Sequence, residues 1–288
     1  MKLEVRDICK SYGENKALDS LSYTFEKGVY GLLGENGAGK STLLSIITGL
    51  LIQDEGEVLL DGSKISDLGA KYREKLGYVS QHQALYDNYT LEEYLRYIAV
   101  IKGIDRKKTE EEINKSIRAV NLSEVGKNKI KTFSGGMKQR AMLAQALLGN
   151  PEILILDEPS AGLDPKERVR MKNIISKLSH DRIIILATHI VSDIEMLADR
   201  VLILRKGRLV AEGSVRELTE GLNEKVFEIL LTAEEYDKSN GEYLVSGLEY
   251  DNNGMIRLRI VSESHTGEMN SVIPRLDDVY LYYFKDEK

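Results

Sequence analysis

Short stretches of alternating or continuously apolar residues fill the chain between residues 1 and 81, a pattern typical of β-strands. We expect strands in the segments KLEVRDICKSYG, KALDSLSYTFEKG, VYGLLG, EGEVLLDG and KLGYVSQ. Between the third and fourth of these, STLLSIITGLL has apolar residues at helical spacing and ends near Gly49. A buried strand, a glycine-rich loop and a helix are therefore expected in immediate succession.

From about Leu91 to Val125 the apolar spacing becomes helical. The first of these helices is expected to begin with a capping box, because Thr90 is followed by Glu93. Farther along, MKQRAMLAQALLG reads as an amphipathic helix, and the apolar segments EILILDEP, IIILATH and DRVLILRKG alternate with helical ones. This alternation predicts an α/β fold with a mostly parallel sheet that is covered on both faces.

The composition of the chain changes near Thr219. Beyond it, KVFEILLT, EYLVSGLEY and MIRLRIVS read as short strands, and DDVYLYYF is an apolar, aromatic tail. Within MIRLRIVS, alternation places Leu258 and its aliphatic neighbours on one face and Arg259 on the other. We therefore expect residues 219–288 to form a small α+β domain attached to an α/β domain of residues 1–218.

Composition and charge narrow the classes of function. The chain has 288 residues and a formal net charge of −6, so broad neutralisation of nucleic-acid phosphates is not expected. Cys9 is the only cysteine, which excludes an intrachain disulfide and a CxxC metal site and fits a reducing, cytoplasmic setting. There is no long apolar run and no apolar signal core at the start. Direct membrane insertion is therefore not expected, and any membrane role must come through a partner.

The segment GENGAGKS, residues 34–41, matches the pattern G-x-x-x-x-G-K-[ST]. Glycines in such a loop let backbone N–H groups turn toward phosphate oxygens, and the following helix points its positive end at them. Lys40 can reach the β- and γ-phosphates, and the Ser41 hydroxyl can bind Mg²⁺. The expected strand before the loop and helix after it argue against a chance glycine turn. The residues expected to bind ATP here are Gly34, Asn36, Gly37, Ala38, Gly39, Lys40, Ser41 and Thr42.

The segment EILILDEP supplies the second half of such a site. Its apolar strand delivers Asp157 at the carboxyl end, where the carboxylate would hold Mg²⁺. Glu158 would orient and activate the attacking water. Two acidic residues after a strand can also mark the start of a helix, but the phosphate-binding loop favours the catalytic interpretation.

Seven short motifs occur in sequence along the chain: SYG, GENGAGKST, YVSQ, FSGGMKQR, ILILDEP, SAGLDP and ATH. Together they resemble the nucleotide-binding cassette of ABC transporters over roughly residues 1–218. The resemblance implies a P-loop NTPase fold with a mostly parallel core sheet, an N-terminal antiparallel β subdomain and a helical subdomain at about residues 84–148. It also implies that the chain binds ATP and Mg²⁺ and hydrolyses ATP.

In this family, the FSGG-type loop serves the ATP of a second cassette. The resemblance implies that Ser134, Gly135 and Gly136 meet a γ-phosphate held by a partner, so that ATP joins two cassettes, which we expect to be a homodimer. Ser134 can also be the N-cap of the following helix, because capping and anion binding use the same groups. Phe133 and Met137 depart from the commonest signature, LSGGQ, and this variant resembles that of exporters with separate membrane subunits.

The resemblance assigns four further residues. Tyr12 would stack on adenine, and Gln81 would touch Mg²⁺ and the attacking water. Asp164 would communicate across the dimer, and His189 would contact the γ-phosphate as a catalytic switch. Gln83 lies close to Gln81, but only Gln81 directly follows the YVS strand. Without the resemblance, Tyr12 would read as an aromatic residue at a strand end and His189 as a structural histidine.

These motifs predict the ATPase subunit of a bacterial-type ABC exporter. The resemblance implies a transmembrane permease on a separate chain, which would hold the protein at the inner face of the cell membrane. Drugs, antimicrobial peptides, ions and polysaccharides are all compatible substrates. An importer ATPase is the main alternative. A non-transport ABC ATPase is a further one, although such proteins usually have tandem cassettes or a long inserted coiled coil.

The segment QHQALYDNYTL, residues 81–91, is where a permease is expected to dock. Leu85, Tyr86 and Tyr89 are its apolar and aromatic residues, and aromatic residues anchor interfaces well. The alternative is that these side chains pack the helical subdomain onto the sheet. Replacing a packing residue by alanine would destabilise the isolated protein, whereas replacing a docking residue would not.

Overall fold

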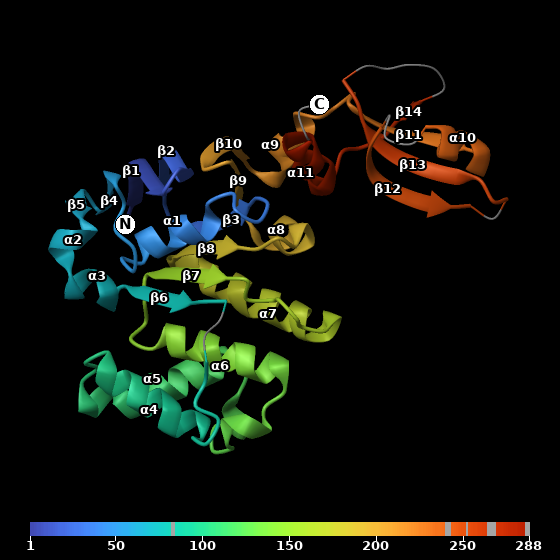
Figure 1. The fold of residues 1–288 in the computed structure, drawn as a ribbon. Helices are drawn as coiled ribbons and strands as arrows, with labels where there is room; N and C mark the ends of the chain where they lie inside the picture. The colour runs from blue at the N-terminus through green and yellow to red at the C-terminus, as the bar shows by residue number, and fades with distance from the viewer. Residues whose placement is uncertain (82–83, 240–242, 252, 264–268, 286–288) are drawn as a thin grey trace.

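The computed structural model describes residues 1–81, 84–239, 243–251, 253–263 and 269–285 (Figure 1). Its centre is a six-stranded sheet of order β10-β9-β3-β8-β7-β6, in which all strands except β10 are parallel. The strands are β3 (Gly28–Leu33), β6 (Leu76–Val79), β7 (Ile153–Asp157), β8 (Ile183–Ala187), β9 (Arg200–Arg205) and β10 (Arg208–Gly213). The mostly parallel α/β sheet predicted from the apolar pattern is therefore confirmed.

Helices cover both faces of this sheet, and every residue of β7 and β8 is buried as a result. Ile155 of β7 shares a hydrophobic core with Leu44 of α1, whereas Leu154, on the opposite face, shares one with Ile174 of α7. Continuous β-branched and leucine runs are the pattern that such two-sided burial requires. The covering helices include α1 (Lys40–Ile47), α7 (Pro165–Leu178) and α8 (Val191–Leu197).

An antiparallel sheet of order β2-β1-β4-β5 lies beside this core (Figure 1). Leu3 and Val5 of β1 alternate and are buried, and a register shift after Val5 places Ile8 in the same core. The turn into β5 uses Asp61 and Gly62 at φ 49° and 82°, the positive values that an Asp-Gly hairpin turn requires. The elements here are β1 (Leu3–Tyr12), β2 (Asn15–Phe25), β4 (Glu55–Leu60), β5 (Ser63–Lys64), α2 (Ile65–Leu68) and α3 (Ala70–Glu74).

A helical subdomain is inserted between β6 and β7 (Figure 1). The predicted capping box is present, since the Thr90 hydroxyl accepts from the Glu93 N–H and the Glu93 carboxylate accepts from the Thr90 N–H. Tyr94, Leu95 and Ile113 help to form its buried core. Its helices are α4 (Leu91–Ile101), α5 (Arg106–Ala119) and α6 (Gly135–Leu147), and 3₁₀ turns occur at Ser123–Val125, Ile130–Thr132 and, after α7, Ser179–Asp181.

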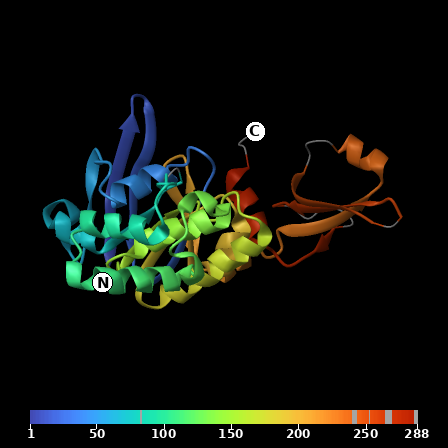
Figure 2. The same ribbon diagram turned by 90° about the horizontal axis from the view of Figure 1, so that it is seen from below.

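The chain then forms a C-terminal sheet of order β12-β13-β11-β14, which projects from the rest of the molecule in Figures 1 and 2. Leu258 lies in a small core with Phe227, whereas Arg259, on the other face, is also buried. Asn252, between β12 and β13, lies outside the described residues. The elements are α9 (Val215–Glu220), β11 (Val226–Leu231), α10 (Ala233–Lys238), β12 (Leu244–Tyr250), β13 (Ile256–Val261), β14 (Asn270–Ser271) and α11 (Leu276–Phe284).

Helix α11 returns from the C-terminal sheet to the central domain (Figure 2). It packs against α8, α9 and β9 as well as against β12 and β13. Leu276 and Val279 belong to the same buried cluster as Ile194 of α8 and Val201 of β9. Residues 219–288 are therefore linked to the preceding domain by a shared core as well as by the chain. None of the helices in the described residues has the length and apolar character needed to cross a membrane.

Candidate active site

The phosphate-binding loop, residues 34–39, joins β3 to α1. A Cβ atom on Gly34 would lie 2.6 Å from the Leu204 carbonyl oxygen, and one on Gly39, at φ 105°, would lie 2.4 Å from the Ala17 carbonyl oxygen. Both positions therefore require glycine for close packing. Gly37, at φ 85°, instead faces open space. The loop is thus closely packed at Gly34 and Gly39 and open at Gly37. Open backbone next to a helix N-terminus is suited to binding a phosphate chain.

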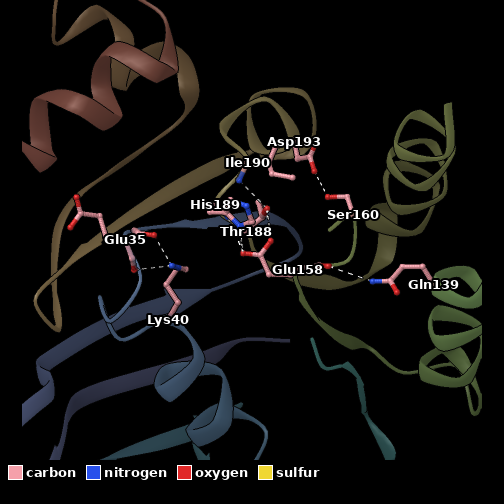
Figure 3. Close-up of polar contacts among 10 residues, drawn as sticks. Glu35, Lys40, Gln139, Glu158, Ser160, Thr188, His189, Ile190 and Asp193 are labelled. Carbon is pink, nitrogen blue, oxygen red and sulfur yellow. Dashed lines mark hydrogen bonds and ion pairs between the residues drawn. The ribbon is translucent and has the colours of Figure 1, made fainter. Parts of the chain in front are cut away.

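Lys40 lies at the first turn of α1, with its ammonium group against the loop (Figure 3). Its Nζ donates hydrogen bonds to the carbonyl oxygens of Gly34 at 2.6 Å and Glu35 at 3.1 Å. Burial lowers the pKa of Lys40, and the carboxylates of Glu158, Asp157 and Glu35 act against that shift. The cation therefore lies within the electrostatic reach of both acidic residues at the end of β7.

Glu158 follows β7 in a strained backbone conformation, with φ 52°. Its N–H donates to the Ala187 carbonyl oxygen at 2.8 Å, which joins the ends of β7 and β8. Its carboxylate accepts from the Thr188 hydroxyl at 3.1 Å and the His189 N–H at 3.1 Å, and it lies 2.8 Å from His189 Nδ1 (Figure 3). The side chain of Glu158 is nearly buried, while that of His189 is largely exposed.

The loop before α1, the turn after β6 and the ends of β7 and β8 all lie at the carboxyl ends of parallel strands, here called the catalytic edge. The fold therefore brings together Lys40, Gln81, Asp157, Glu158 and His189, which are far apart in sequence. Sequence reasoning missed Thr188, whose hydroxyl orients the Glu158 carboxylate. Its position, as a polar residue at the end of an apolar strand, was the signal that could have identified it.

The donors at this edge fit Mg²⁺. The Ser41 hydroxyl, the Asp157 carboxylate and the Gln81 amide oxygen are hard oxygen ligands. No group of three or more His, Cys, Asp or Glu that could hold a metal occurs in the described part of the chain. Mg²⁺ commonly takes most of its ligands from substrate phosphates and water. Gln81 itself is exposed in the turn after β6, and Gln83 lies outside the described residues.

Tyr12 is half-exposed at the end of β1, and the Lys10 ammonium lies 6.0 Å from its ring centroid. The hairpin that carries it borders the phosphate-binding loop, because the Ala17 carbonyl packs against Gly39. The ring is therefore available for stacking near that loop. Its contact with adenine stays a prediction.

The signature segment, residues 133–136, leads into α6 on the helical subdomain, and its two glycines are the first residues of that helix. The Ser134 hydroxyl accepts from the Met137 N–H at 3.2 Å, so its expected N-cap role is confirmed. A Cβ atom on Gly135 would meet open space, whereas one on Gly136 would lie 2.5 Å from Glu167 Oε2. Gly136 therefore packs against α7, and Gly135 keeps an unobstructed backbone at the helix start.

Asp164 is the N-cap of α7, and its carboxylate accepts from the Glu167 N–H at 2.9 Å. Its side chain is exposed, as is that of Ser134. Within this one chain, both residues use their polar groups to cap helices. Their predicted roles toward a second cassette remain predictions.

The fold and its phosphate-binding loop define a P-loop nucleotide-binding domain. The sequence profile of the family described as ABC transporter matches residues 18–161. Similar proteins include the linearmycin resistance ATP-binding protein LnrL of Bacillus subtilis (strain 168), 36% identical over 76% of this chain and 71% of its own. The uncharacterized ABC transporter ATP-binding protein YhcH of the same organism is 32% identical over 97% of this chain and 94% of its own.

Solved structures agree with this assignment. An ATP-binding subunit of an ABC transporter is 30% identical and has a TM-score of 0.68, covering 77% of this chain and 93% of its own. A dimeric ATP-binding cassette in a post-hydrolysis state, bound to ADP and Pi, is 25% identical and has a TM-score of 0.65, covering 74% and 98%. The chain belongs to the ABC transporter family and is an ATP-binding subunit that hydrolyses ATP.

Proposed function

We propose that this chain powers an ABC exporter as one of two identical cassettes beneath a separate transmembrane permease. The observation that supports its catalytic part most directly is the Glu158 carboxylate, held by Thr188 and His189 opposite Lys40. The support for export is the FSGGM signature and a relative named for linearmycin resistance. Import remains the alternative, and the direction of transport in vesicles would distinguish the two.

The residues of the catalytic edge divide the work of hydrolysis. Lys40 and the open backbone at Gly37 would bind and orient the phosphates, and Ser41, Asp157 and Gln81 would hold Mg²⁺. The metal, when bound, would neutralise charge on the phosphate oxygens. Glu158 would accept a hydrogen bond from the attacking water and hold it in line with the γ-phosphate. His189, fixed by Glu158 through Nδ1, would present its other ring nitrogen to the phosphate.

The second cassette would complete this site. Gly135 has open space on its side-chain face and lies at the positive end of α6, so it can approach a phosphate closely. In this single chain it is on the helical subdomain rather than beside Lys40. We therefore infer that Ser134 and Gly135 act on the ATP of a partner, with Asp164 at the same interface.

A permease would dock on the helical subdomain at an aromatic patch, defined as Tyr86, Tyr89 and Tyr97. Their exposed fractions are 49%, 45% and 44%, and the Tyr86 ring centroid lies 5.8 Å and 5.7 Å from those of Tyr89 and Tyr97. Half-exposed aromatic rings in contact with one another favour the docking interpretation for Tyr86 and Tyr89. Leu85 instead packs against the hydrophobic core, which favours the packing interpretation for that residue.

The Glu158→Gln variant tests the catalytic proposal. The amide keeps the size of the side chain but cannot act as a base, so turnover should fall by more than about a hundredfold, or roughly 2.7 kcal/mol. ATP binding should persist, and size-exclusion chromatography with Mg-ATP should show a stable dimer. Glu195→Gln, on the exposed side of α8, is the matched control and should behave as wild type. Wild-type turnover of Glu158→Gln would contradict the assignment.

A further inference from the structure

Three buried polar side chains form a connected group beside the catalytic edge. Asp193 of α8 forms an ion pair with Lys172 of α7, with 2.9 Å between Oδ1 and Nζ, and its second carboxylate oxygen accepts from the Ser160 hydroxyl. Only 9% of the Lys172 side chain and 3% of the Asp193 side chain are exposed. Ser160 is equally well buried. Ser160 begins the SAGLDP motif, whereas Lys172 and Asp193 lie outside the seven motifs.

The positions of these residues in the chain relate them to the catalytic pair. Ser160 lies in the loop that runs from Glu158 to Asp164, and Asp193 lies in the first turn of the helix that follows His189 (Figure 3). Lys172 also donates to the Ser192 carbonyl oxygen at 3.0 Å, so it holds the backbone of that turn as well. The group thus ties the segment after Glu158 to the segment after His189, and both segments to α7.

Stability alone is a weak explanation for such a group. Removing two charges from water is costly, and apolar residues of similar volume often pack helices such as α7 and α8 equally well. The hydrogen bonds from the Ser160 hydroxyl to Asp193 and from Lys172 to the Ser192 carbonyl do provide fixed directions, which apolar contacts lack. The feature that needs fixed directions here is the strained backbone at Glu158, whose carboxylate must meet His189 and the water at the same time.

We propose that Ser160, Asp193 and Lys172 are positioning residues, which hold Glu158 and His189 in their catalytic arrangement. They would act through those two residues without touching the nucleotide. The inference rests on the proposed catalytic roles of Glu158 and His189. It adds that the geometry of the pair depends on a buried group outside the nucleotide site.

Ser160→Ala is the mildest test, because it removes one hydrogen bond and leaves the ion pair intact. We expect kcat of the full chain to fall by more than about tenfold, with KM and ATP affinity within about twofold of wild type. Ser192→Ala, an exposed serine on the same helix as Asp193, is the matched control and should keep wild-type kcat. Activity should be measured well below the lowest melting temperature, so that every variant is folded.

Lys172 provides an independent test by charge. Lys172→Met should lower kcat in the same way, and Lys172→Arg, which keeps the cation, should restore most of it. A purely structural group would lower the melting temperature of these variants but leave kcat per folded molecule unchanged, and that result would overturn the proposal. If Glu158→Gln were itself fully active, the catalytic assignment would fail first. If only Glu158→Gln were inactive, the positioning inference alone would fail.

Discussion

Arg259 and Asp278 form a buried ion pair that joins β13 of the C-terminal sheet to α11. Arg259 Nη2 lies 2.7 Å from Asp278 Oδ2, and Arg259 Nε donates to Asp278 Oδ1 at 3.0 Å. Burial raises the pKa of Asp278, but the hydrogen bonds from Arg259, Ser246 and the Arg275 backbone, together with the Arg259 charge, outweigh it and the pKa is lowered. The pair is therefore charged in the folded protein and fixes how the sheet meets the helix that returns to the central domain.

Asp278→Asn should destabilise this junction by about 3 kcal/mol, because it leaves Arg259 buried without a carboxylate partner. Thermal melting and hydrogen exchange in α11 would measure the loss. Asp277→Asn, at the exposed neighbouring position, is the control and should change stability by less than about 0.5 kcal/mol. Equal melting of both variants would show that the ion pair does not hold α11.

The ion pair also predicts that the stability of the protein depends on pH in the acidic range. The pKa of Asp278 is lower in the folded protein than in the unfolded chain. Its contribution to the free energy of unfolding is therefore complete above the unfolded pKa, about 3.9. The contribution is lost as the pH falls from there through the folded pKa. Unfolding of wild type and Asp278→Asn should therefore differ most above about pH 4 and converge in stronger acid.

Lys40→Ala and Ser134→Arg should separate the two halves of the nucleotide site. Lys40→Ala removes the cation at the phosphates and should weaken ATP binding to the monomer by at least about tenfold. Ser134→Arg should leave monomer binding within about twofold but prevent ATP-driven dimerisation, which light scattering would show. Ser134→Ala is a control for the lost helix cap alone, a cost of about 1 kcal/mol. An equal loss of monomer affinity in both main variants would contradict a site shared between two cassettes.

Tyr86→Ala and Tyr89→Ala should leave the isolated cassette folded, with a loss of less than about 1 kcal/mol, because both rings are half-exposed. Transport with the partner permease should nevertheless fail in cells. Tyr94→Ala is the control for packing, since Tyr94 is buried and its hydroxyl bonds to Gln145. That variant should lose about 3 to 5 kcal/mol. A similar loss in Tyr86→Ala would assign its ring to the core of the subdomain instead.

The burial of Lys102 leads us to expect that stability changes with pH in the alkaline range. Its Nζ donates to the Leu148 carbonyl oxygen at 2.8 Å, and burial lowers its pKa from 10.5 to about 8. Between these two values the unfolded chain keeps a proton that the folded chain has lost, so raising the pH favours the folded state. Relative to Lys102→Met, wild type should gain about 1 to 3 kcal/mol across that interval. Lys107→Met, at an exposed position of α5, should show no such trend.

Local patterns in the sequence predicted most of the central fold. The period of the apolar residues located the strands and helices, and the spacing of Thr90 and Glu93 gave the capping box. Arg259 is an example of what such local patterns do not predict. Alternation placed it correctly on the face opposite Leu258, but that face is covered by α11, a contact that depends on tertiary structure.

The sequence likewise predicted the motifs of the candidate site, but it did not predict the buried polar residues packed beside them. Lys40, Asp157 and Glu158 follow apolar strands or a glycine-rich loop, and this context is readable along the chain. Lys172 occurs in a charged helical segment and reads as a solvated residue there. Its burial depends on how α7 meets α8, which no local pattern encodes.

The return of α11 affects how the protein is made. Domains fold as units while the chain leaves the ribosome, starting from the N-terminal side. The surface around Ile194 and Val201 is complete long before Leu276 and Val279, which cover it, have been synthesised. During that interval the nascent cassette presents uncovered apolar side chains to chaperones and to neighbouring chains. A chain stopped just before α11 would therefore be an aggregation-prone product rather than a shorter working cassette.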